Sequence, residues 1–266
     1  RSTMNKNHHQ QKKVIVSLTS FPSAIPYAIQ AIRSILEGSL LPDKVVLYLD
    51  TSKFPGGVLP PELESLRANN PILDIRFDDA DIRSYKKLIP ALKDFPDDII
   101  VTIDDDICYY KDMLRDLVRI HQQHPDAIIA HRVRRAKLNR PYKVWRKYKW
   151  YDFIFKKFHF SHLAMQTGVG GVLYPPHSLD EKMLRSELFM EIAPTVDDIW
   201  FWLAAVSKGT YVIPVPGWHP QIVEVGKPVE VSLKTVNLEP GNDRNRKALE
   251  RILEKYIFSV FDNYTE

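Results

Sequence analysis

The stretch "DDIIVTIDDDICYY", residues 97–110, joins an apolar run directly to three adjacent acids. Residues 99–103 are typical of a buried strand, and Asp104, Asp105 and Asp106 follow at its carboxyl end. Alternate residues of an extended segment point to the same side, so the side chains of Asp104 and Asp106 are expected to converge. Clustered carboxylates repel each other unless a cation or basic groups neutralise them. The stretch predicts metal or phosphate chemistry at a strand end, with a solvated acidic turn as the alternative.

The segments around this stretch alternate between two hydrophobic periods. Short apolar runs typical of strands are followed by longer segments with apolar residues three and four apart, as in helices. The expected strands cover residues 13–18, 43–50, 72–77, 98–103 and 127–131, and the expected helices cover 25–38, 59–70, 84–95 and 111–124. Pro90 is expected to kink or end the helix that contains it. This order predicts an α/β fold with a mixed, mostly parallel sheet flanked by helices.

In such sheets, ligands bind outside the carboxyl ends of the strands. The acidic triplet lies at one such end, and Thr19 and Ser20 follow the first expected strand at another. Two separate segments therefore indicate one crevice.

The pattern changes after residue 131. Residues 131–160 are dense in Arg, Lys, Trp, Tyr and Phe, and "MQTGVGGVLYPP" (165–176) is rich in glycine and then proline. A helix is expected over 193–209, a strand over 210–215 and an amphipathic closing helix over 243–261. The basic aromatic block suits three partners: a nucleic acid, a sugar acceptor or an anionic membrane surface.

Composition limits the class of protein. The chain has 266 residues and is 44% hydrophobic, which suits one large domain or a core domain with appendages. Its net charge of +4 suits either an ordinary basic protein or one whose basic residues meet phosphates. The sequence has no run of eighteen apolar residues, so no membrane-spanning helix is expected. Cys108 is the single cysteine, so an internal disulfide and a cysteine-based zinc site are excluded. The N-terminus has no apolar core of a signal peptide, and residues 1–3 before Met4 are expected to be a cloning remnant. A cytosolic setting is the simple expectation.

Asp197 and Asp198 form a second acidic site near the start of the expected helix 193–209. Negative charge is favoured at a helix N-terminus, so a purely stabilising role is one interpretation. The following residues "IWFW" are strongly apolar, however, and a partly desolvated carboxylate is more basic. The pair is therefore also a candidate general base.

Three further groups are candidates for ligand binding. Gly168, Gly170 and Gly171 do not fit the dinucleotide-binding fingerprint and favour a substrate-facing loop. Arg83, Tyr85, Lys86 and Lys87 precede the acidic strand and could meet a base, ribose or phosphate, although a solvated helix face suits each of them equally. His219 in "PGWHP" is a candidate metal ligand or a structural loop residue.

Taken together, "SYKKLIPAL", "DDIIVTIDDDI", "TGVGGVLYPP" and "APTVDDIWFW" resemble segments of glycosyltransferases of the GT-A fold. More narrowly, the four segments in this order look like a bacterial family-2-like group that acts in polysaccharide or lipooligosaccharide assembly. The resemblance covers residues 13–245. It implies a catalytic domain over 13–242, with a nucleotide-binding half (13–131) and an acceptor half (132–242), after an N-terminal disordered segment (1–12) and before a C-terminal helix (243–266).

The resemblance also implies residue roles. Asp104 would lie near the donor ribose, with Asp105 assisting or fixing the turn, and Asp106 would hold Mn²⁺ or Mg²⁺ on the diphosphate, with Asp104 as a further ligand. His219, a candidate from its residue type alone, would complete such a site. Thr19, Ser20 and the segment with Arg83, Tyr85, Lys86 and Lys87 would border the nucleotide. Asp198 would be the base of an inverting displacement, although Asp stands at the first position of the pair where the family has Glu, so the choice between Asp197 and Asp198 stays open. Gly168, Gly170, Gly171 and Trp200 would face the donor sugar and the acceptor.

The expected ligands are a nucleotide-sugar donor, with a UDP-sugar as the first candidate, and a saccharide or lipid-linked acceptor. The charge that offsets the acidic triplet is expected to arrive as a divalent cation rather than from this chain. A cytoplasmic location is expected, and peripheral contact with the cytoplasmic membrane face is left open. No nucleic-acid partner is expected.

Two rivals come from other classes. A phosphatase of the haloacid-dehalogenase type also has a strand that ends in DxD, but usually carries Thr or Val where Cys108 stands, and has the motif at its first strand. A nucleic-acid-binding module would rest on residues 131–160.

Overall fold

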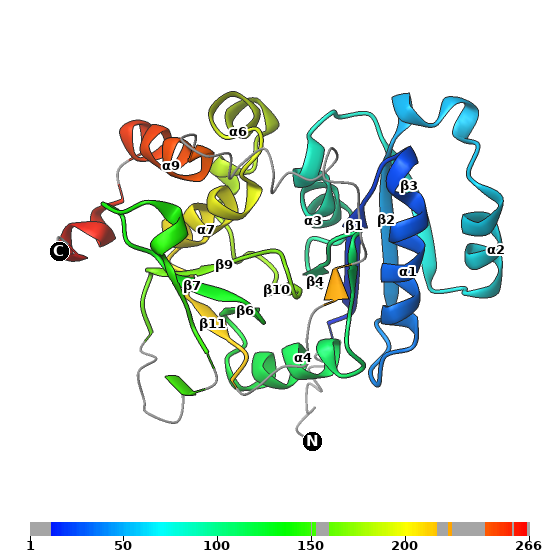
Figure 1. The fold of residues 1–266 in the computed structure, drawn as a ribbon, viewed down its shortest axis with the longest axis horizontal. Helices are drawn as coiled ribbons and strands as arrows, with labels where there is room; N and C mark the ends of the chain where they lie inside the picture. The colour runs from blue at the N-terminus through cyan, green and yellow to red at the C-terminus, as the bar shows by residue number, and fades with distance from the viewer. Residues whose placement is uncertain are drawn as a thin grey trace, which may run out of the picture.

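The computed structural model describes residues 12–149, 151–152, 160–216, 223–224, 243–256 and 258–264. Its centre is a seven-stranded sheet in the order β11-β6-β10-β4-β1-β2-β3 (Figure 1). The strands are β1 (Val14–Thr19), β2 (Lys44–Asp50), β3 (Leu73–Asp78), β4 (Ile99–Thr102), β6 (Ile128–Ala130), β10 (Val172–Tyr174) and β11 (Val212–Pro214). All neighbours are parallel except β10, which is antiparallel to β4 and to β6. The predicted α/β fold with a mixed, mostly parallel sheet is confirmed.

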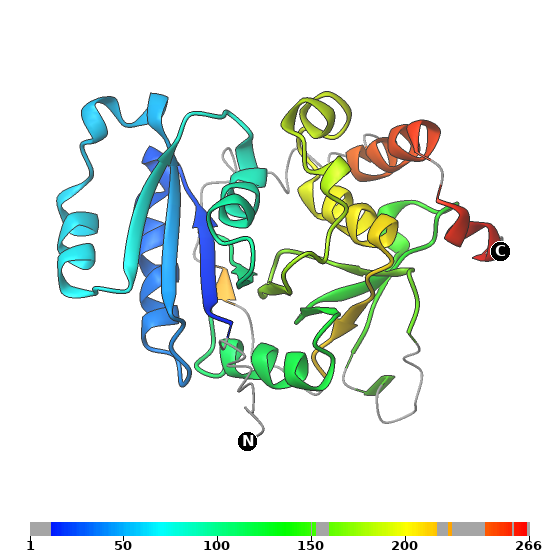
Figure 2. The ribbon, with the colours of Figure 1, turned by 180° about the vertical axis from the view of Figure 1, so that it is seen from behind.

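Helices cover both faces of this sheet. Alternate residues of β1 point to opposite faces, so that Val16 and Leu18 belong to one core and Ile15 to the other. The first core is completed by α1 (Ile25–Leu36), α2 (Pro61–Asn69) and α4 (Met113–Gln123). The second is completed by α3 (Ile89–Asp94), α6 (Ser186–Ile192), α7 (Asp197–Lys208) and α9 (Arg244–Lys255). Helix α1 lies in front of the sheet in Figure 1 and behind it in Figure 2.

The segment expected as one helix over 84–95 is two elements. A 3₁₀ helix, η4 (Arg83–Lys87), comes first, and α3 begins at Ile89. Pro90 stands in the first turn of α3, where its missing N–H costs no intrahelical hydrogen bond. The expected helix is therefore interrupted close to Pro90, at Leu88, but Pro90 helps to start a helix rather than ending one.

The basic aromatic segment contributes to a second, smaller sheet. Strand β7 (Val133–Arg135) pairs with β8 (Arg146–Lys147) and with β9 (Ala164–Gln166), antiparallel in both cases. A third sheet joins β5 (Ile107–Cys108), directly after the acidic triplet, to β12 (Val223–Glu224). These short strands were not predicted.

The closing helix is shorter than the expected 243–261. Asp243 caps α9 by accepting a hydrogen bond from the Arg246 amide, and Tyr256 ends it with an extended backbone. The apolar face of α9 is buried in the core through Ala248, Leu249 and Ile252. Across the described ranges, no helix is long and apolar enough to cross a membrane.

Candidate active site

Lys87 lies at the centre of the acidic groups. Its Nζ atom is 3.1 Å from Oδ1 of Asp104 and 3.0 Å from Oδ2 of Asp197. Burial lowers the pKa of this ammonium group, but the negative charges of Asp104, Asp197 and Asp198 outweigh burial and hold its pKa well above the usual value. Part of the charge that offsets the triplet therefore comes from this chain, contrary to the expectation that a metal supplies it.

The 3₁₀ helix η4 explains how Lys87 reaches Asp197. Residues three apart in a 3₁₀ helix lie on the same side, and Ser84 and Lys87 have this spacing. The Ser84 hydroxyl donates to Oδ1 of Asp197 at 2.9 Å, while Lys87 binds Oδ2. Both oxygens of the buried Asp197 carboxylate are thus engaged by one short element.

Two other residues of η4 that were expected at the nucleotide have partners within the protein. The buried Tyr85 stacks on Phe189 at 4.1 Å and donates to the carbonyl of Ala193. Lys86 is buried and donates to the carbonyl of Asp78 at 3.0 Å. The protein itself therefore satisfies Tyr85 and Lys86, and Arg83 alone of this group is exposed.

Asp198 occupies a different environment from Asp197. It is half-buried in the first turn of α7, and its Oδ2 atom accepts a hydrogen bond of 3.0 Å from the Gly168 amide. Burial and the negative charge of Asp197 raise the pKa of Asp198 to about 7, although Lys87 lowers it. A carboxylate with this pKa can accept a proton near neutral pH. Of the two acids, the geometry favours Asp198 as a base.

Gly168 is the point where the two acidic segments meet. A methyl group on its Cα atom would lie 2.8 Å from Lys87 Nζ, 3.1 Å from Asp198 Oδ1 and 3.4 Å from Asp104 Oδ1. Only glycine allows the backbone to approach these groups so closely. Gly170 and Gly171 instead form the turn, with φ angles of 100° and 93°, and Gly171 faces the side chain of Met113 in α4. Of the three predicted glycines, Gly168 is the one that faces the site.

The acidic turn is fixed by neighbours on both sides. Asp105 is buried and accepts a hydrogen bond of 2.7 Å from the Ser20 hydroxyl, which ties the turn to the end of β1. The Asp104 amide donates to the Tyr109 hydroxyl at 2.8 Å. Asp105 and Ser20 thus hold each other, while Asp104 and Asp106 are half-buried.

Thr19 also has an internal partner, because its hydroxyl donates to the carbonyl of Tyr48 at 2.8 Å. Trp200 is fully buried, and its indole donates to the carbonyl of Met183. The structure therefore places Trp200 in the core rather than against an acceptor. His219 lies outside the described residues.

The donor atoms present fit a hard divalent cation that is shared with a substrate. Within the described ranges, no three His, Cys, Asp or Glu side chains gather as a metal-binding group. Mg²⁺ is commonly held by one or two carboxylates together with substrate phosphates, and Asp104 and Asp106 can supply these. Asp104 and Asp106 thus suit a cation that binds together with a diphosphate.

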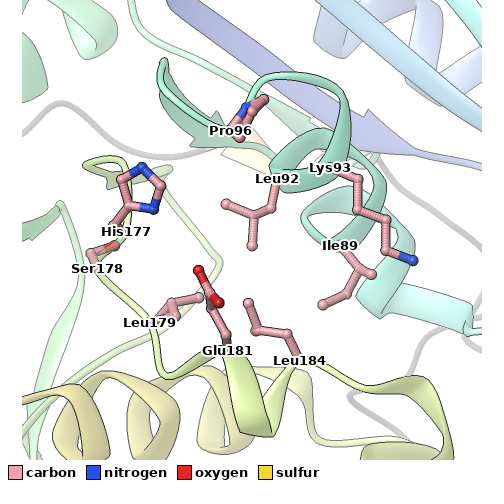
Figure 3. Close-up of a pocket in the computed structure, with 9 residues that line it drawn as sticks. All are labelled: Ile89, Leu92, Lys93, Pro96, His177, Ser178, Leu179, Glu181 and Leu184. Carbon is pink, nitrogen blue, oxygen red and sulfur yellow. The ribbon is translucent and has the colours of Figure 1, made fainter.

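A separate hollow lies away from the acids (Figure 3). It is formed between α3, which contributes Ile89 and Leu92, and the segment after β10, which contributes His177 and Leu179. Because β10 is antiparallel to β4, His177 lies toward the start of β4, where its Nε2 atom is 3.0 Å from Asp97. None of the predicted site residues lines this hollow.

Three residues near the site had no functional signal in the sequence. Ser84 binds Asp197, Tyr109 binds the Asp104 backbone, and Tyr142 lies in the electrostatic field of Asp198. Spacing from Lys87 could have indicated Ser84 if the segment had been recognised as a 3₁₀ helix.

Comparison with known proteins shows the fold. No protein-family model matches the chain, and no curated protein matches it by sequence. Among solved structures, the chain is similar to a mannosyltransferase from Pyrobaculum calidifontis in complex with GDP-Man and Mn²⁺. The TM-score is 0.53 at 15% identity, with 91% of this chain and 69% of the mannosyltransferase covered. The chain therefore has an α/β fold that a glycosyltransferase also has.

Proposed function

We propose that the chain is a metal-dependent, inverting glycosyltransferase that moves a sugar from a nucleotide-diphosphate donor to a saccharide hydroxyl. One observation carries the proposal: the acidic turn after β4 and Asp198 of α7 meet around the Cα atom of Gly168. The fold shared with the mannosyltransferase supports this reading over a phosphatase or a nucleic-acid-binding module.

The donor side of the site lies at the acidic turn. Asp106 and the second carboxylate oxygen of Asp104 would hold Mn²⁺ or Mg²⁺, and His219 remains a proposed further ligand. When bound, the cation offsets negative charge on the leaving diphosphate. Thr19 and Ser20 would border the nucleotide from the end of β1, with Arg83 as the exposed cation beside it.

The acceptor side lies at Asp198. Its carboxylate would take the proton of the acceptor hydroxyl while that oxygen forms the new bond to the anomeric carbon. The bond from this carbon to the donor phosphate oxygen breaks, and its electron pair leaves with the nucleoside diphosphate. Attack from the face opposite the leaving group inverts the anomeric configuration. Asp197, whose two oxygens are engaged, would position Asp198 rather than act as the base.

The natural acceptor would be a saccharide or a lipid-linked saccharide in bacterial surface polysaccharide assembly, reached in the cytoplasm or at the inner membrane face. The donor base is open between a UDP-sugar, as the sequence suggested, and a GDP-sugar, as in the complex of the mannosyltransferase.

A transfer assay with panels of UDP- and GDP-sugars in the presence of Mn²⁺ tests the proposal. Removal of a general base lowers the rate about 10²–10⁴-fold, so Asp198→Asn should do the same. The matched control is Asp97→Asn, an exposed acid at the other end of β4, which should keep the wild-type rate. Wild-type turnover by Asp198→Asn would remove Asp198 from the role of base.

A further inference from the structure

Two arginines lie near the loop that binds Asp198. Arg132 and Arg134 flank Val133, which is 1% exposed and points into the core. Because side chains alternate along a strand, Arg134 lies on the opposite face of β7 from Val133, while Arg132 stands in the bend directly before the strand. The Arg132 carbonyl accepts a hydrogen bond of 3.0 Å from the Thr167 amide, and the next residue, Gly168, binds Asp198. The bend before β7 and β7 itself thus place two positive charges near the loop that holds the candidate base.

Tyr142 connects these arginines to Asp198. The Arg134 guanidinium lies 4.9 Å from the centre of the Tyr142 ring, and its terminal nitrogen donates to the Trp145 carbonyl at 2.8 Å. Burial and the negative charge of Asp198 raise the pKa of Tyr142 to about 12, while the positive charges of Arg134 and Arg132 and a side-chain hydrogen bond with Arg134 lower it. The tyrosine hydroxyl is therefore within the field of the acid and of both arginines.

Arg134 is incompletely satisfied. Its Nε atom is buried without a hydrogen-bond partner, and none of the described carboxylates pairs with its guanidinium. Other arginines of comparable exposure have acids: Arg76 binds both Asp74 and Asp94. Buried polar groups normally find partners, so the orphaned Nε atom shows that the described residues do not fully satisfy this guanidinium. The side chain as a whole is only half-buried, which leaves it able to donate to a ligand. The planar guanidinium fits a carboxylate or a phosphate through paired hydrogen bonds.

We propose that the acceptor saccharide carries an anionic group, a carboxylate or a phosphate, that docks on Arg134 beside Arg132 and so presents a hydroxyl to Asp198. This inference rests on the proposed transferase function, because it assigns the substrate class of the same site. The stacking of Arg134 on Tyr142 fixes the guanidinium before the ligand arrives, which reduces the ordering cost of binding.

A direct binding measurement tests the anion site separately from the proposed transferase function, because binding requires no turnover. Calorimetry with glucuronic acid, glucose 6-phosphate and glucose measures acceptor-side affinity, and the carboxylate and phosphate arms tell the two anions apart. At least one anionic sugar should bind 10-fold or more tightly than glucose. Arg134→Gln should reduce this preference to about 2-fold or less, and Arg134→Lys, which keeps the charge but loses the planar fork, should lie between.

Arg135→Gln is the matched control, because Arg135 is the neighbouring exposed arginine of β7 and points to the other face. It should retain the preference. Equal affinity for all three sugars in the wild type, or the same preference in Arg134→Gln as in the wild type, would overturn the proposal. Melting temperatures show whether each variant is folded, and Arg132→Gln provides a second variant if Arg134→Gln is not.

The proposed transferase function has a separate test. It is contradicted if the wild type binds no nucleotide in the presence of a divalent metal ion. Anionic sugar binding that persists in that case would leave an anion site without a transferase. Nucleotide binding without any anion preference would leave a transferase that takes a neutral acceptor.

Discussion

Asp198 makes the stability of the folded protein depend on pH. The pKa of Asp198 is about 7 in the folded protein, whereas an aspartate has an ordinary pKa of 3.8, which we take for the unfolded chain. Between these two pH values, the folded protein therefore binds more protons than the unfolded chain. Stability must then fall as pH rises through this window. Asp198→Asn removes this unfavourable contribution and should stabilise the protein at pH 8 by about 1–2 kcal/mol.

Urea unfolding of the wild type and Asp198→Asn at pH 8 and at pH 5 measures this difference. The gain should be clearly smaller at pH 5, where Asp198 is still protonated in the folded wild type. A variant that is less stable than the wild type at pH 8 would show that the ionised carboxylate is favourable where it lies.

Gly168 and Gly171 should respond to alanine in opposite ways. Gly168→Ala places a methyl group against Lys87 and Asp198, so transfer activity should fall about 100-fold or more while the free energy of unfolding changes little. Gly171→Ala forces alanine into a φ of 93° and against Met113, so it should cost about 1–3 kcal/mol of stability.

Activity assays and urea unfolding on both variants distinguish the two effects. If Gly168→Ala kept full activity, the loop at Gly168 would not border the reacting groups.

The 3₁₀ helix η4 is the element that organises the site. Lys87→Met leaves the buried carboxylate of Asp197 and the half-buried carboxylate of Asp104 without their cation and should destabilise the protein by about 3–5 kcal/mol. Ser84→Ala removes one hydrogen bond to Asp197 and should cost about 1 kcal/mol. Arg83→Ala, in the same element but exposed, serves as the control and should change stability by less than about 0.5 kcal/mol.

Denaturant unfolding of the three variants orders these costs. Equal stability of Lys87→Met and the wild type would mean that the acids lose their charge when the lysine is removed.

The alternation of strands and helices in residues 13–131 could be predicted because each element is long enough to show its period. Strand β10 could not, since Val172–Tyr174 is three apolar residues and a run of that length has no period to read. Its antiparallel insertion between β4 and β6 is what carries Gly168 to the acids. The burial of Lys86 and Lys87 in η4 could not be predicted for a similar reason. Two adjacent lysines before a strand do not reveal which of their side chains is buried.

Across the whole molecule, the acidic edge of the sheet gathers residues that are far apart in the sequence. Parallel strands β1 and β4 place Ser20 and Asp105 at the same edge, and this part of the site was predictable from strand polarity alone. Asp198 and Lys87 reach that edge from helices, so their contacts depend on packing that the sequence does not specify. His177 and the apolar hollow lie at the opposite ends of the strands, near the start of β4 (Figure 3).

Because the proposed cation and nucleotide complete one site together, they should stabilise the whole fold together. A ligand at 100 times its dissociation constant adds about 2.7 kcal/mol to the free energy of unfolding. For a chain of this size, that raises the melting temperature by roughly 5–10 °C. The shift should appear with Mn²⁺ plus UDP or GDP and be much smaller with either component alone, since two half-buried carboxylates hold a cation weakly without phosphate oxygens.

Asp106→Ala should abolish this joint shift, whereas Asp97→Ala, at the far edge of the sheet, should retain it. The measurement is a thermal-shift titration of wild type and both variants, with calorimetry to give the dissociation constants. A full shift in Asp106→Ala would exclude Asp106 as a metal ligand. An equal shift from the nucleotide without Mn²⁺ would mean that the cations of this chain, Lys87 and Arg83 foremost, neutralise the diphosphate by themselves.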